Sequence, residues 1–110
     1  MEIRVDKDEK CPIVSVKGRM DALTAPDFEK QVSEMIEKGD TDFIIDLAEL
    51  EYISSAGLRN ILAAAKKLKQ KEKRLYLAAL QDGVKEVFEI SGFSGIIPIF
   101  DSVENVLKQI

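Results

Sequence analysis

A nearly continuous apolar run, Asp42-Phe43-Ile44-Ile45-Asp46-Leu47, has the length of a single β-strand. A strand that is buried on one face alternates apolar and polar residues, whereas an unbroken apolar run is typical of a strand that is covered on both faces in a parallel sheet. The sequence therefore predicts a central strand over residues 42–47, with helices packed against both faces of its sheet.

The segments on either side of this run alternate between the two periodicities of secondary structure. Apolar residues recur at every second position in the strand-like segments and at i, i+3, i+4 and i+7 in the helix-like ones. The predicted elements are strands at 3–6 and 13–16 joined by a charged turn at 7–10, a helix at 25–38, the central strand, a link at 48–53, a helix that starts at Ser54 or Ser55 and whose apolar stripe extends to Leu68, a strand at 75–80, a short helix around 84–90, a strand at 96–100 and a helix at 103–110.

The ends of two helices carry recognisable capping patterns. Thr24 is predicted to be the N-cap of the first helix, with Leu23 placed to pack as a hydrophobic staple against Phe28. Asp101 followed by Glu104 resembles a capping box at the start of the last helix.

This order of elements predicts an α/β fold. Strands that alternate with helices require a largely parallel sheet with right-handed crossovers. We expect a mostly parallel sheet of four to five strands with about four helices, formed by a single domain over residues 1–110. Pro98 cannot donate a hydrogen bond to a neighbouring strand, so the last strand is expected at an edge.

The composition excludes several classes of chemistry. The chain has 110 residues with one Cys and no His, so an intrachain disulfide, His-based catalysis and most zinc sites are excluded. No segment approaches the ~20 apolar residues of a membrane span. We therefore expect a cytoplasmic protein that has no metal and no catalytic residues.

The charge is acidic overall but uneven along the chain. The net charge is −4, which disfavours nucleic acid as a partner. Residues 1–55 carry seven basic and fourteen acidic groups, whereas residues 56–110 carry nine and six. Six of the basic residues fall between Lys66 and Arg74, where they could attract an acidic partner or an anionic membrane surface. A solvated helix end is the expected interpretation, so no membrane partner is predicted.

Two segments lie where ligands gather in open α/β sheets, beyond the carboxyl ends of the strands. They are Gly18-Arg19-Met20-Asp21 and Tyr52-Ile53-Ser54-Ser55-Ala56-Gly57-Leu58-Arg59. The second places two serines and small residues at a helix N-terminus, where free backbone amides and the helix dipole stabilise a phosphate. From the residues alone, either a phosphorylation site or simple capping by Ser54 or Ser55 accounts for this pattern.

The second segment resembles the signature of the STAS-domain family, specifically of the bacterial anti-sigma factor antagonists, whose usual motif reads Asp-Ser-Ser/Ala-Gly-Leu before a helix. The first segment resembles the family's Gly-x-hydrophobic-Asp turn, and Asp46-Leu47 resembles the Asp-Leu that closes its central strand. The order of predicted elements is similar to that of the family over essentially the full chain.

The resemblance implies an adaptor that binds an anti-sigma factor with serine kinase activity and so frees a sigma factor. In the family the kinase phosphorylates the adaptor, which ends binding, and a PP2C-type phosphatase restores it. The modified residue maps onto Ser55, with Ser54 as second choice because Ser54 replaces the Asp of the usual motif. The implied partner-binding residues are Met20, Asp21, Ser54, Ala56, Gly57, Leu58 and Arg59.

Other functions remain alternatives at this point. STAS domains also serve as non-enzymatic regulatory subunits of transporters and of stress-sensing complexes. A serine nucleophile needs a positioned base, and without His only a Lys or a carboxylate could serve, so we expect no enzyme activity. The glycine-rich signatures of nucleotide-binding loops are absent from the sequence, so we expect no cofactor. We also expect a monomer when the protein is alone.

Overall fold

The computed structural model describes residues 1–8 and 10–110. The elements in chain order are β1 (Glu2–Lys7), β2 (Pro12–Met20), α1 (Ala25–Lys38), β3 (Phe43–Asp46), β4 (Leu50–Ile53), α2 (Ser55–Gln70), β5 (Leu75–Ala78), α3 (Asp82–Ile90), the 3₁₀ turn η1 (Phe93–Gly95), β6 (Ile99–Phe100) and α4 (Val103–Gln109). The predicted turn at 7–10 includes Glu9, which lies outside the described residues.

The strands form one mostly parallel sheet in the order β1-β2-β3-β5-β6, with β4 paired to the end of β2. Among the strands of residues 1–8 and 10–110, only the pair β1 and β2 is antiparallel. β3 occupies the middle of the sheet, as its apolar sequence predicts, and β6 lies at the edge. The α/β class, the parallel sheet and the four helices are confirmed, while the described strands number six rather than four to five.

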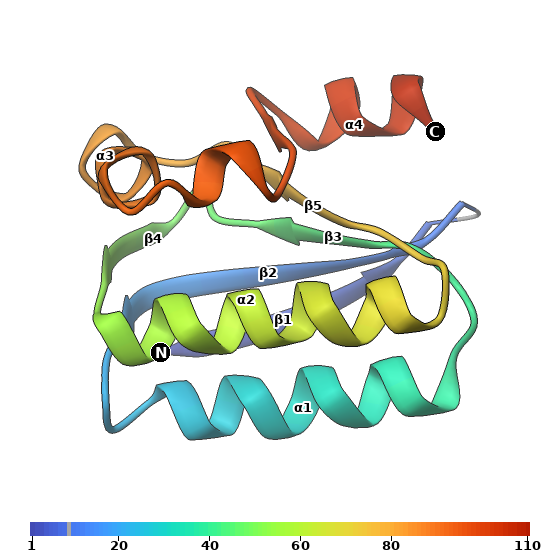
Figure 1. The fold of residues 1–110 in the computed structure, drawn as a ribbon, viewed down its shortest axis with the longest axis horizontal. Helices are drawn as coiled ribbons and strands as arrows, with labels where there is room; N and C mark the ends of the chain where they lie inside the picture. The colour runs from blue at the N-terminus through green and yellow to red at the C-terminus, as the bar shows by residue number, and fades with distance from the viewer. Residues whose placement is uncertain (9) are drawn as a thin grey trace.

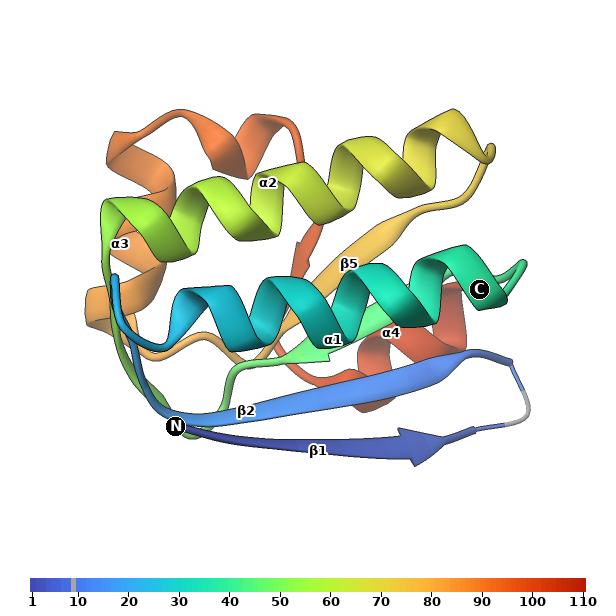
Figure 2. The same ribbon diagram turned by 90° about the horizontal axis from the view of Figure 1, so that it is seen from below.

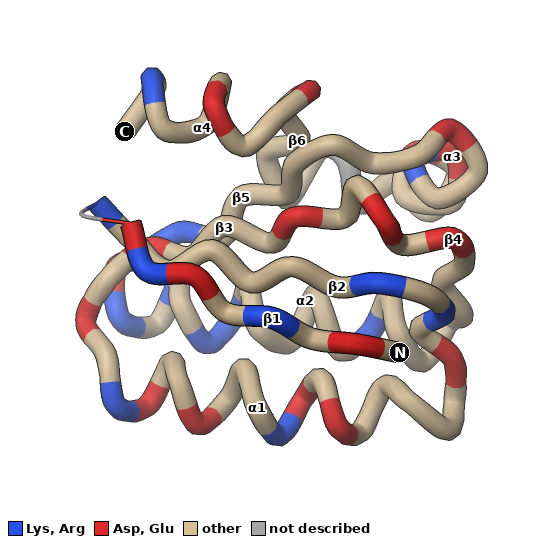
Figure 3. Tube along the Cα trace, turned by 180° about the vertical axis from the view of Figure 1, so that it is seen from behind, with Lys and Arg blue, Asp and Glu red and all other residues tan. Residues whose placement is uncertain are grey.

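Helices cover both faces of the central strands, which explains the unbroken apolar run. α1 and α2 lie side by side on one face, and α4 lies on the other (Figures 1 and 2). Ile45 packs in the large core under α1 and α2, whereas its neighbour Ile44 packs with Val106 of α4. The view from behind shows α4 beside β3 and β5, and charges of alternating sign along the outer strand β1 (Figure 3).

The predicted link at 48–53 contains a strand, which corrects that part of the prediction. Leu50 and Ile53 are buried, and β4 pairs with β2 through Arg19↔Tyr52 and Met20↔Ile53. Gly18 has a φ of +99°, a conformation that favours glycine, at the irregularity where the pairing between β2 and β4 shifts register. The exposed Glu51 between the two buried residues made the strand resemble a polar linker.

The capping predictions are partly wrong. Thr24 is the N-cap residue of α1, as predicted, but its side chain makes no capping hydrogen bond to the helix. Leu23 is 89% exposed, so it does not pack as a staple. At α4, the capping oxygen belongs to Ser102, which accepts a hydrogen bond from the Asn105 amide at 3.1 Å. Asp101 lies one residue too early for this role.

Two predicted strands are shorter in the structure. β5 ends at Ala78, because Ala79 adopts a φ of +61° that an extended strand does not allow. The predicted strand at 96–100 is reduced to Ile99–Phe100, because the amides of Ile96 and Ile97 both donate to the carbonyl oxygen of Phe93 at 3.0 Å, in continuation of η1. Pro98 nevertheless contributes its carbonyl oxygen, which accepts a hydrogen bond from the Leu77 amide at 3.0 Å.

Candidate functional site

The two predicted site segments meet at one corner of the molecule. β2 and β4 end side by side, with Met20 opposite Ile53, and the Ser54 amide donates a hydrogen bond to the Met20 carbonyl oxygen at 2.8 Å. α2 begins at the next residue, Ser55. The turn that contains Asp21 and the start of α2 therefore share a single surface at the carboxyl ends of two parallel strands.

The two serines have different environments. Ser54 is the N-cap of α2, and its hydroxyl oxygen accepts a hydrogen bond from the Gly57 amide at 3.2 Å. Ser55 is the first residue of the helix and is exposed. Within the described residues no hydrogen bond engages the Ser55 hydroxyl. Ser54 thus has a structural role, whereas the Ser55 hydroxyl is accessible to another protein.

Gly57 is required by close packing under this corner. A Cβ atom at Gly57 would lie 2.8 Å from Cγ1 of Ile53, 2.9 Å from Cγ of Met20 and 3.1 Å from the Met20 carbonyl oxygen. Contacts this short include backbone, so they cannot be relieved by moving one flexible side chain. The glycine of the motif lets the first turn of α2 lie directly on the ends of β2 and β4.

Asp21 organises the turn between β2 and α1. Its Oδ1 accepts hydrogen bonds from the amides of Leu23 at 3.0 Å and Thr24 at 3.1 Å, while the Thr24 hydroxyl donates to the Arg19 carbonyl oxygen at 2.8 Å. The amide of Thr24, followed by that of Leu23, lowers the pKa of the Asp21 carboxyl below its ordinary value. Asp21 therefore holds the turn as a carboxylate at neutral pH.

Some of the predicted partner-binding residues are accessible to solvent, and others are buried beneath them. Arg59 is exposed, and Asp21, Ser54 and Ala56 are half-buried. Three others are buried: Met20, Gly57 and Leu58. Their packing fixes the position of the exposed residues around Ser55.

Sequence reasoning missed an exposed group beside these residues. The Arg19 guanidinium carbon lies 4.2 Å from the centre of the Tyr52 ring, a cation–π contact, and Tyr52 is 40% exposed. Leu23 is also exposed on the neighbouring turn. The pairing of Arg19 with Tyr52 follows from the register of β2 and β4, so recognising β4 in the sequence would have found it.

The whole chain matches a known family in sequence. The model of the STAS domain family matches residues 2–106. The chain belongs to the STAS domain family. One relative of this STAS domain is BtrV of Bordetella bronchiseptica, named provisionally as an anti-sigma factor antagonist, which is 39% identical over 104 residues that make up 94% of this chain and 90% of BtrV.

Solved structures of anti-sigma factor antagonists have the same architecture as this STAS domain. An anti-sigma factor antagonist from Mycobacterium paratuberculosis superimposes on this STAS domain with a TM-score of 0.90 and 22% identity, over 99% of this chain and 92% of the other. SpoIIAA from Bacillus, in its phosphorylated form, gives a TM-score of 0.77 and 16% identity, over 98% of each chain. At these identities the likeness demonstrates a shared fold.

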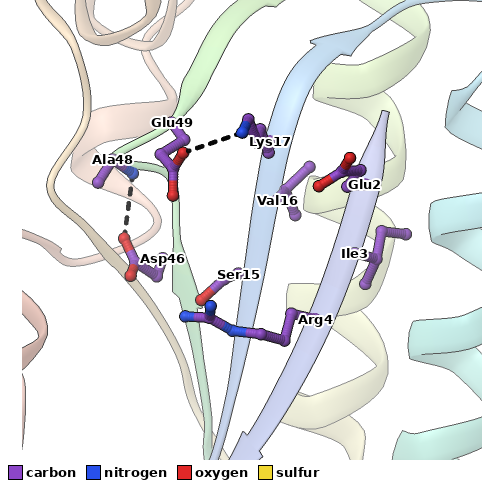
Figure 4. Close-up of a pocket in the computed structure, with 9 residues that line it drawn as sticks. All are labelled: Glu2, Ile3, Arg4, Ser15, Val16, Lys17, Asp46, Ala48 and Glu49. Carbon is purple, nitrogen blue, oxygen red and sulfur yellow. Dashed lines mark hydrogen bonds and ion pairs between the residues drawn. The ribbon is translucent and has the colours of Figure 1, made fainter.

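A small cavity lies on the sheet face away from α2. It has a volume of about 140 Å³ and is bordered by Arg4, Ser15 and Asp46 (Figure 4). The Lys17 ammonium pairs with the Glu49 carboxylate at 3.7 Å, and the Ala48 amide donates to Asp46 at 3.0 Å. This volume lies below the ~300 Å³ at which ligand pockets begin, so we assign the cavity no function.

The described residues contain neither a cluster of metal-binding side chains nor a helix that could cross a membrane. No group of three or more Cys, Asp or Glu side chains is arranged there to hold a metal ion. Among the helices of residues 1–8 and 10–110, none combines the length and apolar character that a bilayer crossing requires.

Proposed function

We propose that this STAS domain is a cytoplasmic anti-sigma factor antagonist that is switched by phosphorylation of Ser55. In its bare form it binds an anti-sigma factor with serine kinase activity, and this frees a sigma factor. Transfer of a phosphoryl group from the kinase's nucleotide to the Ser55 hydroxyl ends the complex. A PP2C-type phosphatase removes the phosphate by hydrolysis and returns the adaptor to its binding form.

The exposed hydroxyl of Ser55 carries this proposal. It belongs to the first residue of α2, beside a cap that Ser54 already provides. The first amides of a helix have no partners within the helix, and the dipole there favours negative charge. A phosphate of about −1.5 to −2 charge can therefore be added to this residue without breaking the helix or its cap.

The relatives support the same assignment. BtrV, at 39% identity, is named as an antagonist of an anti-sigma factor. SpoIIAA, which shares the fold, has been solved in a phosphorylated form, so this architecture is compatible with a phosphate. Binding, rather than catalysis, also fits a surface that is built from a turn, a strand end and a helix start.

Release follows from the charge that phosphorylation adds to the contact surface. Leu23 and Tyr52 offer exposed apolar area beside Ser55, and Asp21 already supplies a negative charge. Covering a phosphate in such an interface leaves a desolvated charge without a partner, at a cost of ~2 to 5 kcal/mol. At ~1.4 kcal/mol per tenfold, the partner binds roughly thirty-fold to several-thousand-fold more weakly.

Affinity capture from native cells tests this function. Immobilised Ser55→Ala is expected to retain a kinase of the anti-sigma type and to remain unmodified when ATP is added. Immobilised Ser55→Asp is expected to lose most of that kinase. The matched control is Gln109→Glu, which adds the same single charge at an exposed position of α4, on the other face of the sheet. It should bind like the unaltered protein.

Two results would contradict the proposal. Equal capture of the kinase by Ser55→Ala and Ser55→Asp would remove the charge mechanism. Phosphorylation that persists in Ser55→Ala and disappears in Ser54→Ala would move the modified residue to the helix cap. In either case the role of Ser55 as the switch is wrong.

A further inference from the structure

The basic cluster at residues 66–74 separates into two sets with different environments. Lys67 and Lys71 turn toward α1: the Lys67 ammonium donates to the Ser33 hydroxyl at 2.7 Å, and that of Lys71 donates to the carbonyl oxygens of Ile36 at 2.6 Å and Gly39 at 2.5 Å. These two side chains are four residues apart and so lie on one side of α2. Their charges tie α2 to the end of α1.

The other four basic residues line a groove on a different side of α2. They are Lys66, Lys69, Lys73 and Arg74, and the groove has a volume of about 730 Å³. None of them forms an ion pair with a carboxylate of the described residues. Glu72 is the one acidic residue among those that line the groove, so its lining carries an excess of three positive charges.

The rest of the groove is mainly apolar. Its lining includes Leu62 and Ala65 of α2 and the segment Ile96–Pro98, which follows η1 and lies beside α2 (Figure 2). Ile97 is buried and anchors this segment, whereas Ile96 is 63% exposed. The groove therefore combines exposed apolar area with four cations that pair with no described carboxylate, in a domain with a net charge of −4.

We propose that this groove binds an acidic amphipathic helix of a partner protein. The apolar lining and Ile96 match the apolar stripe of such a helix, while Lys66, Lys69, Lys73 and Arg74 match acidic residues along the border of that stripe. The groove is open to solvent along one side, so it covers one face of an occupant and leaves the polar face in water. An amphipathic helix has one apolar face and one polar face, so it fits such a groove.

The groove is a separate site from the surface around Ser55. Lys66 is the basic residue of the groove that lies nearest to Ser55 along α2, eleven positions away, which corresponds to about 16 Å along the helix at 1.5 Å per residue. At that distance about two Debye lengths of physiological salt separate the phosphate from the groove. Binding in the groove is therefore expected to continue when Ser55 is phosphorylated, and it does not depend on the proposed switch.

The test uses a designed probe and the full chain. The probe is a fluorescein-labelled helical peptide of Glu, Ala and Leu, with Leu at i, i+3, i+4 and i+7 and Glu on both borders of the stripe. One control peptide has the same composition in an order that destroys the stripe, and another replaces Glu with Lys. Fluorescence anisotropy measures affinity, and amide chemical shifts in NMR spectra locate the bound peptide.

We expect the acidic amphipathic peptide alone to bind and to shift the amides of residues 62–74 and 95–97. The double variant Lys69→Glu/Lys73→Glu should bind about tenfold more weakly or worse, because two attractive contacts become repulsive. The matched control, Lys30→Glu/Lys85→Glu, reverses two exposed lysines outside the groove and should bind normally. Ile96→Ser should weaken binding, and Ser55→Asp should leave it unchanged.

Several outcomes would overturn the proposal. Equal binding of the two acidic peptides would mean that charge alone is recognised. Equal binding by the two double variants, or shifts confined to the Ser55 surface, would place the peptide elsewhere. Binding to vesicles that contain anionic lipid but not to the peptide would assign the groove to a membrane surface. Self-association that Lys69→Glu/Lys73→Glu abolishes would assign it to a second copy of this chain.

Discussion

The two ends of α2 are built in opposite ways. At the N-terminal end, Ser54 caps the helix and Gly57 lies in close contact with β2 and β4, while the Ser55 hydroxyl makes no described hydrogen bond. At the C-terminal end, Lys69 and Lys73 line an open groove and pair with no described carboxylate.

This difference separates two ways of making a binding surface. The N-terminal end positions one modifiable hydroxyl on a rigid frame, so small changes beneath it are costly to stability. The groove side of the C-terminal end offers charge and apolar area that the fold does not need, so changes to Lys69 or Lys73 are expected to affect binding and to leave stability nearly unaltered. Substitutions at matched positions of the two ends can therefore test whether their contributions to stability differ.

The largest effect is expected from Gly57→Ala. The new methyl group overlaps Ile53 and the backbone of Met20, which should lower the free energy of unfolding by about 2 to 3 kcal/mol. Gly83→Ala is the control, because a Cβ there meets nothing within 4 Å inside helix α3, and it should stabilise by about 0.5 to 1 kcal/mol. Urea unfolding of both variants checks this. Similar stabilities would show that the first turn of α2 is not tightly packed.

A smaller effect is expected from removing the cap. Ser54→Ala deletes the acceptor of the Gly57 amide and should lower the free energy of unfolding by about 1 kcal/mol. Ser55→Ala, one residue further along, should change it by no more than about 0.5 kcal/mol, since its hydroxyl makes no described hydrogen bond. Thermal and urea unfolding measure both. A larger loss of stability in Ser55→Ala than in Ser54→Ala would mean that Ser55, and not Ser54, caps the helix.

Lysines that bind α1 should contribute more to stability than lysines that line the groove, although the difference is smaller than the effects above. Lys71→Met removes the ammonium that binds the Ile36 and Gly39 carbonyl oxygens and should lower the free energy of unfolding by about 0.5 to 1 kcal/mol. Lys69→Met removes the same charge from the groove and should have an effect of a few tenths of a kcal/mol. Equal losses in urea unfolding would contradict the division of the basic cluster.

The smallest effect concerns the charge of Asp21 and its dependence on pH. The folded protein lowers the pKa of this carboxyl, so the stability it contributes is present above the unfolded value, 3.8, and is lost as the pH falls through the lower, folded value. Asp21→Asn keeps an acceptor oxygen but no charge. The stability difference between the two proteins should be constant near neutral pH and shrink below about pH 4. A difference that is independent of pH from neutral into this acid range would contradict the turn described for Asp21.

The sequence predicted those parts of the fold that depend on periodicity. The central strand was identified because Ile44 and Ile45 face different layers and both must be apolar. β4 was missed because it has only four residues, two of them polar and exposed, and its pairing with β2 is a long-range contact. Short strands of this kind gain their stability from partners that local sequence does not reveal.

The site was predicted in position but less well in detail. The motif located the residues around Ser55, and helix capping alone could not decide which serine stays free. The structure decides this through the Gly57 amide, which bonds to Ser54. The burial of Met20 and the pairing of Arg19 with Tyr52 depend on the register of β2 with β4, so they could not be read before that strand was known.

The central claim is that Ser55 is the residue at which binding is switched. Peptide mass spectrometry of the protein purified from its native cells under several growth conditions tests it most directly. We expect a population that carries one phosphate, located on Ser55, with none on Ser54. A phosphate on Ser54, or an abundant protein without phosphate on either serine under every condition, would contradict it.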